Sequence, residues 1–404
     1  MRVAVAVATK IALTVLTAGL LVSAASAQTF KVFHAFSFTD GSQPNGDLLR
    51  DSAGNFYGTT VLGGSSNRGV IFKLDPQGND TTLYTFTGGT DGGFPIGRVI
   101  SDTAGNLYGV TSLGGDATCS CGTVYELKTD GTLTVLHAFK GGTDGSQNEG
   151  QPELGLVEIG GDFYGSASFG GVSGCDGSLG CGVVYKVTGS GKETVLHRFA
   201  GKSDGAFPQD LIGDKKGNLY GNVESYSDGG SIFKMTTSGK LSNLYVFPGG
   251  AGGTSPRWRL IRHTNGVFYG VTQFGGNTST CPTGSSGCGV VFTVNAKGKE
   301  SVLHTFGVKT NDGAIPSGGL LDLAGNLYGV TVYGGTTNST CTFGCGIVYR
   351  ASTGGKYKVL YRFTGGNDGW LPSGGLTEDS SGNLYGAVSL GGSDDQGVIF
   401  EITP

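Results

Sequence analysis

Short apolar segments separated by glycine-rich turns recur along the whole chain. Within residues 82–127, four such segments follow one another, at 82–86, 98–101, 106–111 and 123–127. Each is rich in Val, Leu, Tyr or Phe and is bounded by Gly, Asp or Pro, which is typical of β-strands and their turns. The pattern therefore predicts four short strands in this stretch.

The same four-strand unit occurs in seven copies. Its marker is a Tyr-Gly pair that follows a turn with Asn or Asp, and the tyrosines are Tyr57, Tyr108, Tyr164, Tyr220, Tyr269, Tyr328 and Tyr385. Consecutive markers are 49 to 59 residues apart. Seven repeats of four short strands indicate an all-β, seven-bladed β-propeller with four-stranded blades.

A solenoid is the alternative architecture, but the ends of a solenoid carry polar caps. This chain begins instead with a lone strand-like segment at 31–36, and its last repeat ends at 397–402 without an outermost strand. We therefore predict that 31–36 pairs with 397–402 and closes the ring, which removes exposed sheet edges. In each blade we expect the proline-led strand to lie innermost.

The repeat also resembles a known family. The motifs that carry the resemblance are Gly105-Asn106-Leu107-Tyr108-Gly109-Val110-Thr111, Gly114-Gly115 and Gly122-Thr123-Val124-Tyr125. They are similar to the GloVer-type tandem repeat of secreted bacterial proteins, also called choice-of-anchor tandem-repeat proteins. The resemblance covers nearly all of the chain after residue 27. It implies a secreted repeat protein, and it implies no catalytic residue.

Residues 1–27 have the pattern of an export signal. Arg2 and Lys10 precede an apolar run at 11–22, and Ala25-Ser26-Ala27 provides small residues for cleavage. The run is shorter than the ~20 residues of a membrane span. We expect cleavage near Ala27, a secreted or periplasmic protein without a membrane span, and one seven-repeat domain over 28–404.

Composition excludes several other classes of protein. Glycine accounts for 78 of 404 residues but follows no three-residue period, which excludes collagen. Aromatic residues make up 10% of the chain, and this content argues against disorder. Of the 27 Lys and Arg residues, two precede residue 28, which leaves 25 against 31 acidic residues. This balance disfavours nucleic acid as a partner.

All eight cysteines lie in the loops that begin with Gly-Gly, and each has another cysteine close by. The pairs are Cys119 with Cys121, Cys175 with Cys181, Cys281 with Cys288, and Cys341 with Cys345. The repeats without cysteines have shorter loops at this place. In an exported protein this spacing predicts four local disulfides. The pairs lie far apart around a ring and lack neighbouring histidines, so we expect no metal site and no cofactor.

Two sets of aspartates mark the two faces of the ring. On the face of the Gly-Gly loops, which we call the loop face, equivalent positions hold Asp40, Asp91, Asp144, Asp204, Asp312 and Asp368. They either build the turns between blades or form a ring of carboxylates that attracts cations or a basic partner. On the opposite face, which we call the turn face, type I turns are predicted to begin at Asp51, Asp102, Asp214, Asp322 and Asp379.

The histidines mostly follow the repeat. His34, His137, His197 and His304 share the outer-strand position that Tyr84, Tyr245 and Tyr361 occupy in other copies. A residue that alternates with Tyr within one chain is predicted to pack rather than to catalyse. His263 alone departs from this pattern, because it occupies the turn position of the second aspartate set.

The fifth copy differs from the others in its innermost strand. It carries Arg257, Trp258 and Arg259, and Trp258 stands where Gly46, Gly97, Gly318 and Gly374 stand elsewhere. Arg and Trp dominate binding hot spots, and Trp can stack on a sugar. The alternative is a local repacking of one blade, since Trp is commonly buried. We expect Arg257 and Trp258 to be partly accessible on the loop face, and we add Arg259, Trp370 and the six loop-face aspartates to the candidate binding set.

No enzyme motif is present, because Gly-x-Ser-x-Gly, His-Glu-x-x-His and phosphate-binding loops are all missing. The leading hypothesis is a secreted binding module whose loop face contacts a carbohydrate, a cell-wall component or a protein. One alternative is an exported hydrolase or lyase that uses acids such as Asp47, Asp210 or Glu153 near the central channel. The other alternative is a purely structural repeat protein.

Overall fold

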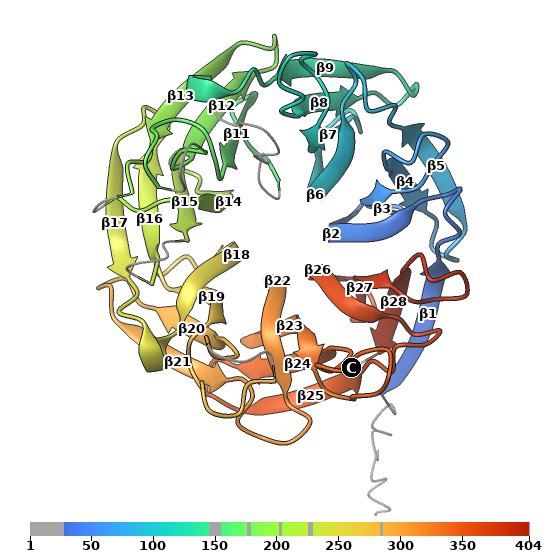
Figure 1. Ribbon diagram of the computed structural model, residues 1–404, viewed down its shortest axis with the longest axis vertical. Helices are drawn as coiled ribbons and strands as arrows, with labels where there is room; N and C mark the ends of the chain where they lie inside the picture. Colours follow the sequence, from blue (N-terminus) through green and yellow to red (C-terminus); the bar gives the residue numbers. More distant parts are fainter. Residues whose placement is uncertain are drawn as a thin grey trace, which may run out of the picture.

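The chain folds into a ring of seven blades around a central axis (Figure 1). The computed structural model describes residues 28–144, 155–175, 179–201, 204–224, 229–282 and 286–403. Within these ranges, seven four-stranded antiparallel sheets form, which confirms the predicted all-β propeller. The predicted signal segment 1–27, with its cleavage site near Ala27, and Glu153 lie outside the described residues.

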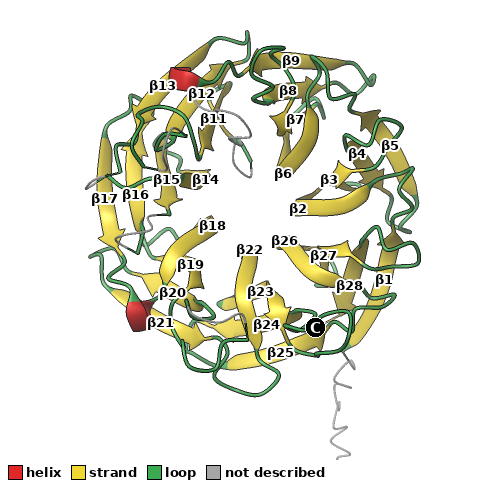
Figure 2. Cartoon of the chain, in the orientation of Figure 1, coloured by secondary structure: helices red, strands yellow, loops and turns green. Residues whose placement is uncertain are grey.

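Each blade takes four strands in order from the axis to the rim, and only two short 3-10 helices, η1 (Gly142–Asp144) and η2 (Gly250–Gly252), occur in the described part of the chain (Figure 2). Blades one and two contain β2 (Ser42–Arg50), β3 (Phe56–Leu62), β4 (Val70–Leu74), β5 (Asp80–Thr85), β6 (Gly93–Ser101), β7 (Leu107–Leu113), β8 (Thr123–Leu127) and β9 (Leu133–Ala138). Blades three and four contain β10 (Val157–Ile159), β11 (Asp162–Ala167), β12 (Val183–Thr188), β13 (Glu193–Arg198), β14 (Pro208–Gly213), β15 (Asn218–Val223), β16 (Ser231–Thr236) and β17 (Leu241–Val246).

The remaining three blades complete the ring. Blades five and six contain β18 (Thr254–Arg262), β19 (Phe268–Phe274), β20 (Val290–Val294), β21 (Glu300–Thr305), β22 (Gly313–Leu323), β23 (Asn326–Gly334), β24 (Ile347–Ser352) and β25 (Tyr357–Arg362). Blade seven contains β26 (Trp370–Glu378), β27 (Leu384–Leu390), β28 (Val398–Thr403) and, at its rim, β1 (Thr29–Ala35) from the other end of the chain.

The N-terminal strand closes the ring as predicted. β1 pairs antiparallel with β28, and the pairs include Lys31 with Glu401 and Ala35 with Val398. The Lys31 ammonium lies 3.6 Å from the Glu401 carboxylate. The closing strand therefore gives the last blade the same four-stranded sheet as the other six.

The third strand of each blade is buried on both of its faces. In β4 the side chains of Val70, Ile71, Phe72 and Leu74 are fully buried, and only Lys73 between them reaches solvent. Neighbouring blades cover both faces of the sheet at this depth. This is why the strand has a continuous apolar run instead of simple alternation.

At six of the seven joints, adjacent blades meet through a glycine and a proline. The glycine just before the third strand has a positive φ, and its Cα lies against the proline ring of the next blade. A Cβ atom at Gly230 would lie 2.4 Å from Pro256 Cδ, and one at Gly397 would lie 2.5 Å from Pro44 Cδ. The same contact joins Gly69 to Pro95, Gly182 to Pro208, Gly289 to Pro316 and Gly346 to Pro372. The ring closure therefore uses the same glycine–proline seam as the other joints.

A backbone hydrogen bond accompanies this seam. The residue before the proline adopts a left-handed conformation and donates its N–H to the preceding blade, as Gln43 does to the Gln396 carbonyl at 2.8 Å. Phe94, Phe207, Ser255 and Ile315 repeat this geometry. A side chain before proline rarely adopts such a backbone conformation. Its recurrence shows that the interblade contact overrides the local preference.

Most turns on the turn face follow the prediction. The Asp51 carboxylate accepts hydrogen bonds from the Asn55 N–H at 2.9 Å, the Asn55 side-chain amide at 2.7 Å and the Tyr57 hydroxyl at 3.0 Å. Asp102, Asp214 and Asp379 make the same set of bonds. The marker tyrosine of the repeat therefore fixes the turn that precedes it.

The predicted type I turn at Asp322 is wrong. β22 continues through Asp322 to Leu323, and the hairpin turns at Ala324 and Gly325 with φ values of 53° and 81°. Two positive φ angles are typical of a two-residue type I′ turn. The extra pair between Leu323 and Asn326 shortens the turn, and the Asp322 carboxylate contacts His263 of blade five.

We predict that the glycine–proline seam limits stability. Gly230→Ala should lower the free energy of unfolding by about 2–5 kcal/mol, because left-handed strain adds to overpacking against Pro256. Gly131 is the matched control, since its φ of 86° is similar but nothing lies within 4 Å of an added Cβ. Gly131→Ala should cost only about 1–2 kcal/mol. Equal losses in denaturant unfolding would show that the proline contact is unimportant.

Candidate functional site

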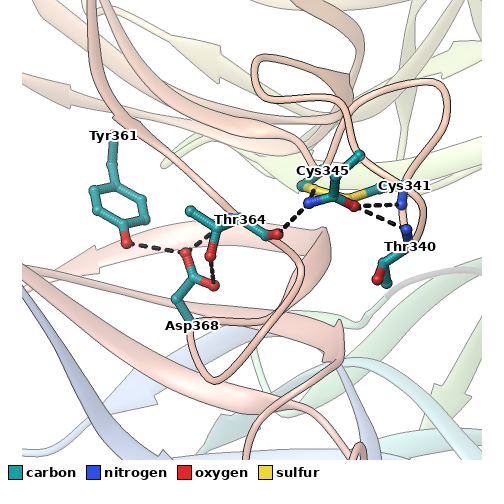
Figure 3. Close-up of a disulfide and its surroundings, with 7 residues drawn as sticks. Thr340, Cys341, Cys345, Tyr361, Thr364 and Asp368 are labelled. Carbon is teal, nitrogen blue, oxygen red and sulfur yellow. Dashed lines mark hydrogen bonds between the residues drawn. A yellow bond between two sulfur atoms is a disulfide. The ribbon is translucent and has the colours of Figure 1, made fainter.

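The six loop-face aspartates contact groups of the blade whose rim strand precedes them, and Asp312 also accepts a hydrogen bond from the Tyr357 hydroxyl of the next blade at 2.7 Å. In blade six, Asp368 accepts hydrogen bonds from the Tyr361 hydroxyl at 2.9 Å, the Thr364 N–H at 2.8 Å and the Thr364 hydroxyl at 2.6 Å (Figure 3). Asp91 repeats this arrangement with Tyr84 and Thr87. The carboxylate thus fixes the turn that leads from the rim strand to the next blade. This geometry favours the turn-building interpretation over a ring of free carboxylates.

Histidine replaces tyrosine in the equivalent contacts of other blades. His34 Nε2 lies 3.3 Å from Asp40, His197 Nε2 lies 3.3 Å from Asp204, and His304 Nε2 lies 3.2 Å from Asp312. Burial raises the pKa of Asp40, but the bonds from His34 and Ser37 outweigh burial and lower it overall. The predicted packing role of these histidines thus includes a polar contact with the loop-face aspartate.

The fifth copy has no loop-face aspartate, and its rim tyrosine, Tyr245, binds a different carboxylate. The Tyr245 hydroxyl donates to Glu300 of the next rim strand at 2.8 Å. Burial, with the Glu300 bond second, raises the pKa of Tyr245. The acceptor at the rim is therefore supplied by the adjacent blade where the repeat lacks its own.

Blades two and three meet at the rim in a cluster of ionisable groups. His137 Nε2, Asp144 Oδ1 and Glu193 Oε1 are all buried without a hydrogen-bond partner among the described residues. Burial and the charge of Asp144 raise the pKa of Glu193 to about 7, and burial with the charge of Lys140 lowers the pKa of His137 to about 4. Burial therefore disfavours the charged forms of Glu193 and His137 at this place.

The loops of the loop face are tied down by disulfides and amides. The four predicted local pairs form, with Cα–Cα distances of 5.1 to 5.3 Å, and no cysteine is free. In the Cys341–Cys345 loop, the Asn338 amide donates to the Thr364 carbonyl at 2.6 Å. Its side-chain oxygen accepts from the Thr340 N–H at 2.8 Å. Hydrogen bonds through Thr364 thus link the disulfide loop to the turn that Asp368 holds (Figure 3).

The axis of the ring is occupied by two ion pairs. One position of the innermost strand, directly after Gly46 in the first copy, points inward in each described blade. It holds Asp47, Arg98, Gly155, Asp210, Arg259, Gly319 and Gly375. Arg259 Nη2 lies 2.7 Å from Asp47 Oδ2 across the ring, from blade five to blade one. Arg98 of blade two pairs with Asp210 of blade four.

The three glycines at this level make room for the charged side chains. A Cβ at Gly155 would lie 2.9 Å from the Arg98 side chain, and one at Gly375 would lie 2.8 Å from Asp47 Oδ1. A Cβ at Gly319 would lie 3.1 Å from Arg259 Cβ. Charged and empty positions are therefore complementary around the axis. The sequence interpretation missed Arg98. The signal that could have found it is that Arg98 follows Gly97 as Asp47 follows Gly46, so both occupy the same position of the repeat.

These contacts bear on the acids considered for catalysis. Asp47 and Asp210 are largely buried, with side chains 13% and 4% exposed, and each is already paired with an arginine. Asp210 Oδ1 also accepts the Leu211 N–H at 2.8 Å. Both carboxylates are therefore already engaged in contacts within the fold. Among the described residues, no group of three or more His, Cys, Asp or Glu is placed to hold a metal ion.

Trp258 and Arg257 lie between the axis and the loop face. Trp258 adopts a φ of 71°, the left-handed conformation of the glycines that it replaces, and is half-buried. Its indole N–H donates to the Pro316 carbonyl of blade six at 3.2 Å. The Arg257 guanidinium lies 5.6 Å from the Trp258 ring and donates to buried Gln209 at 3.1 Å.

Arg257 is one-third exposed, so the partial accessibility expected for both residues agrees with the structure. The binding role of Arg257, Trp258 and Arg259 stays a prediction. Trp370 begins β26 on the loop face and is half-buried against the core between blades six and seven.

Apolar side chains are exposed mainly on the loop face. Six large apolar residues of the described chain are exposed, and four of them, Phe38, Val172, Val308 and Phe343, lie in loops of this face. Val308 and Phe343 are 59% and 49% exposed and line one groove of about 420 Å³ between blades five and six. The Cys281–Cys288 and Cys341–Cys345 loops border this groove.

Comparisons with known proteins agree with this architecture. A family model described as the Gloeobacter/Verrucomicrobia repeat matches residues 15–179, 146–339 and 278–404. No curated protein matches the chain. Among solved structures, the extracellular domain of a B. thetaiotaomicron protein assigned as a one-component system is similar, with a TM-score of 0.54 and 13% identity. The match covers 90% of this chain and 40% of that one.

A gluconolactonase from Xanthomonas campestris is a more distant structural neighbour. It matches with a TM-score of 0.44 and 10% identity over 93% of this chain and 89% of that one. At 13% identity, the likeness to the B. thetaiotaomicron domain shows a similar fold alone.

We predict that the axial ion pair between Asp47 and Arg259 contributes to stability. Arg259→Gln should cost about 1–3 kcal/mol, because a largely buried carboxylate loses its charged partner. A double-mutant cycle with Asp47→Asn should give a coupling energy of at least about 0.5 kcal/mol. Additive losses in urea unfolding would contradict a direct interaction.

A second prediction concerns pH. Glu193 has a pKa of about 7 in the fold, above the usual value of 4.5. A raised acid pKa stabilises the fold at low pH, and this contribution is lost as the pH rises through about 7. Glu193→Gln should therefore raise the melting temperature at pH 8 and leave it nearly unchanged at pH 4. An equal change at both pH values would contradict the raised pKa.

Proposed function

The chain belongs to the Gloeobacter/Verrucomicrobia repeat family, and from this premise and the geometry of the loop face we propose that it is an exported binding module. The four local disulfides support export, because such bonds persist in oxidising compartments. The basic and apolar pattern of residues 1–27 supports cleavage near Ala27. Among the described residues, no helix is long and apolar enough to cross a membrane.

The observation that carries the proposal is the groove between blades five and six. Val308 and Phe343 are 59% and 49% exposed, and neither belongs to a buried cluster, although the Phe343 ring has an edge contact with Tyr333. Exposed apolar groups that gather on one face of a protein mark contact sites. The two disulfide loops beside the groove are held in place before a ligand arrives. Such preorganisation lowers the entropic cost of binding.

We propose a saccharide chain as the ligand. The Phe343 ring offers a flat apolar surface of the kind that contacts a sugar face. Thr280, Asn311 and Thr337 line the same groove and supply hydroxyl and amide groups for sugar hydroxyls. Carbohydrate and cell-wall polymers are thus favoured over a protein partner, which would need a contact area of about 800 Å² on this chain.

The hydrolase or lyase alternative receives less support. Its acids Asp47 and Asp210 are engaged with Arg259 and Arg98, and Glu153 lies outside the described residues. A binding role needs none of these acids. The purely structural alternative does not explain why Val308 and Phe343 are exposed together in one groove.

The test is binding of residues 28–404 to an array of bacterial and plant polysaccharides, followed by titration with the best binder. Val308→Ser with Phe343→Ser should weaken binding at least tenfold, because both apolar contacts are lost. Val302→Ser is the matched control, since Val302 is 39% exposed but lies on the rim strand β21. It should leave the affinity unchanged.

Retention on no polysaccharide would refute the saccharide ligand. Equal weakening by the control variant would refute the groove as the site.

A further inference from the structure

A second concave site lies on the turn face, opposite to the disulfide loops. It is a cleft of about 680 Å³ between blades four and five. Its basic lining residues are Lys215, Lys216, Lys234, Arg259 and Arg262. Asp214 is the one acidic residue of the lining. In a chain with 27 basic residues among 404, this concentration of positive charge is unusual.

The acid in the lining is already engaged by its own turn. Asp214 accepts hydrogen bonds from the Asn218 N–H at 2.9 Å and the Tyr220 hydroxyl at 2.9 Å. Burial raises its pKa, but these bonds outweigh burial and lower the pKa to about 2. Within the described residues, Lys215, Lys216, Lys234 and Arg262 form no ion pair. Asp214 is ionised, so the five basic residues of the lining face one carboxylate and the cleft keeps an excess of positive charge.

The fold does not require lysine in this turn. The equivalent turns that begin at Asp51, Asp102 and Asp379 make the same hydrogen bonds with Ser-Ala, Thr-Ala and Ser-Ser in the two central positions. Blade four alone has Lys215-Lys216 there, and both side chains are exposed. The turn geometry thus explains Asp214 and Gly217 but leaves the two lysines unexplained.

Two further cations are held around one aromatic ring. The Arg262 guanidinium lies 4.9 Å from the Tyr220 ring centroid and 5.8 Å from that of Phe268. The Lys234 ammonium lies 5.9 Å from the same tyrosine ring. Arg262 Nε is buried and has no hydrogen-bond partner among the described residues. Like charges held this close repel one another, and an anion in the cleft would relieve the repulsion.

We propose that this cleft binds a multiply charged anion with carboxylate or phosphate groups, of the size of an acidic oligosaccharide. Its volume lies in the range of small-molecule sites. Several separate cations along one cleft match several separate negative charges better than a single one. A guanidinium presents parallel donors that suit a carboxylate or a phosphate. This site is independent of the groove on the loop face.

The test is calorimetric titration of residues 28–404 with three probes at low salt. Trigalacturonate carries carboxylates on a sugar chain, tripolyphosphate carries phosphates, and maltotriose is a neutral sugar of similar length. At least one anionic probe should bind saturably, and its affinity should fall as salt is added. Which of the two binds tells carboxylate recognition from phosphate recognition. Maltotriose should not bind at this site.

Variants locate the site. Lys215→Ala with Lys216→Ala should weaken the anionic probe at least tenfold and leave the melting temperature unchanged, because both side chains are exposed. Lys356→Ala with Lys358→Ala is the matched control. It removes the same charge from exposed positions of blade six and should leave the affinity unchanged. The Val308→Ser, Phe343→Ser variant should also bind the anion normally, which separates the two sites.

Three results would overturn the proposal. The first is the absence of saturable binding by both anionic probes at 1 mM. The second is equal weakening by the control pair of lysine variants, which would indicate unspecific attraction. The third is binding of maltotriose with the same affinity and the same sensitivity to Lys215 and Lys216.

Discussion

Six of the seven joints between blades depend on a glycine that leaves no space for a side chain and a proline ring that fills that space. The contact brings the third strand of one blade against the innermost strand of the next, as Gly230 does with Pro256. It also forces the residue before the proline into a left-handed backbone, which donates a hydrogen bond back across the seam. Because Gly397 and Pro44 repeat this contact, the two ends of the chain are joined by the same interaction as any two neighbouring blades.

The seam brings the innermost strands close together around the axis. At this level, each charged side chain is paired with one of opposite charge, and glycines leave the space that these side chains need. Two arginines and two aspartates form two pairs, and three glycines leave room for them. Charges taken out of water are tolerated only when they are paired in this way. The axis of this propeller is thus occupied by its own side chains at that level. Binding surfaces are then to be sought on the two faces of the ring.

The two faces differ in chemistry because their connections differ in length. Short turns on the turn face are fixed by an aspartate and the marker tyrosine, so only their central positions are free to vary. In blade four those positions are lysines. Longer connections on the loop face are fixed by disulfides and by aspartate contacts to His or Tyr at the rim. This leaves apolar residues such as Phe343 exposed at their tips.

The sequence by itself determined the architecture, because the repeat is a local property. Strand segments, turn aspartates, local cysteine pairs and the missing rim strand of the last copy all lie within one repeat length or at the chain ends. The sequence did not determine the type I′ turn at Ala324. The pattern Asp-x-x-Gly fits both turn types, and the additional strand pair between Leu323 and Asn326 decides which one forms. The sequence also did not indicate which charged side chains form ion pairs at the axis.

Arg98 and Asp210 are 112 residues apart, and Arg259 and Asp47 are 212 apart. No spacing along the chain indicates which arginine faces which aspartate. The same holds for the cleft of the turn face, where Lys216 and Arg262 come from different repeats. Only closure of the ring brings such residues together, because side chains on separate blades acquire neighbours through the curvature of the whole ring.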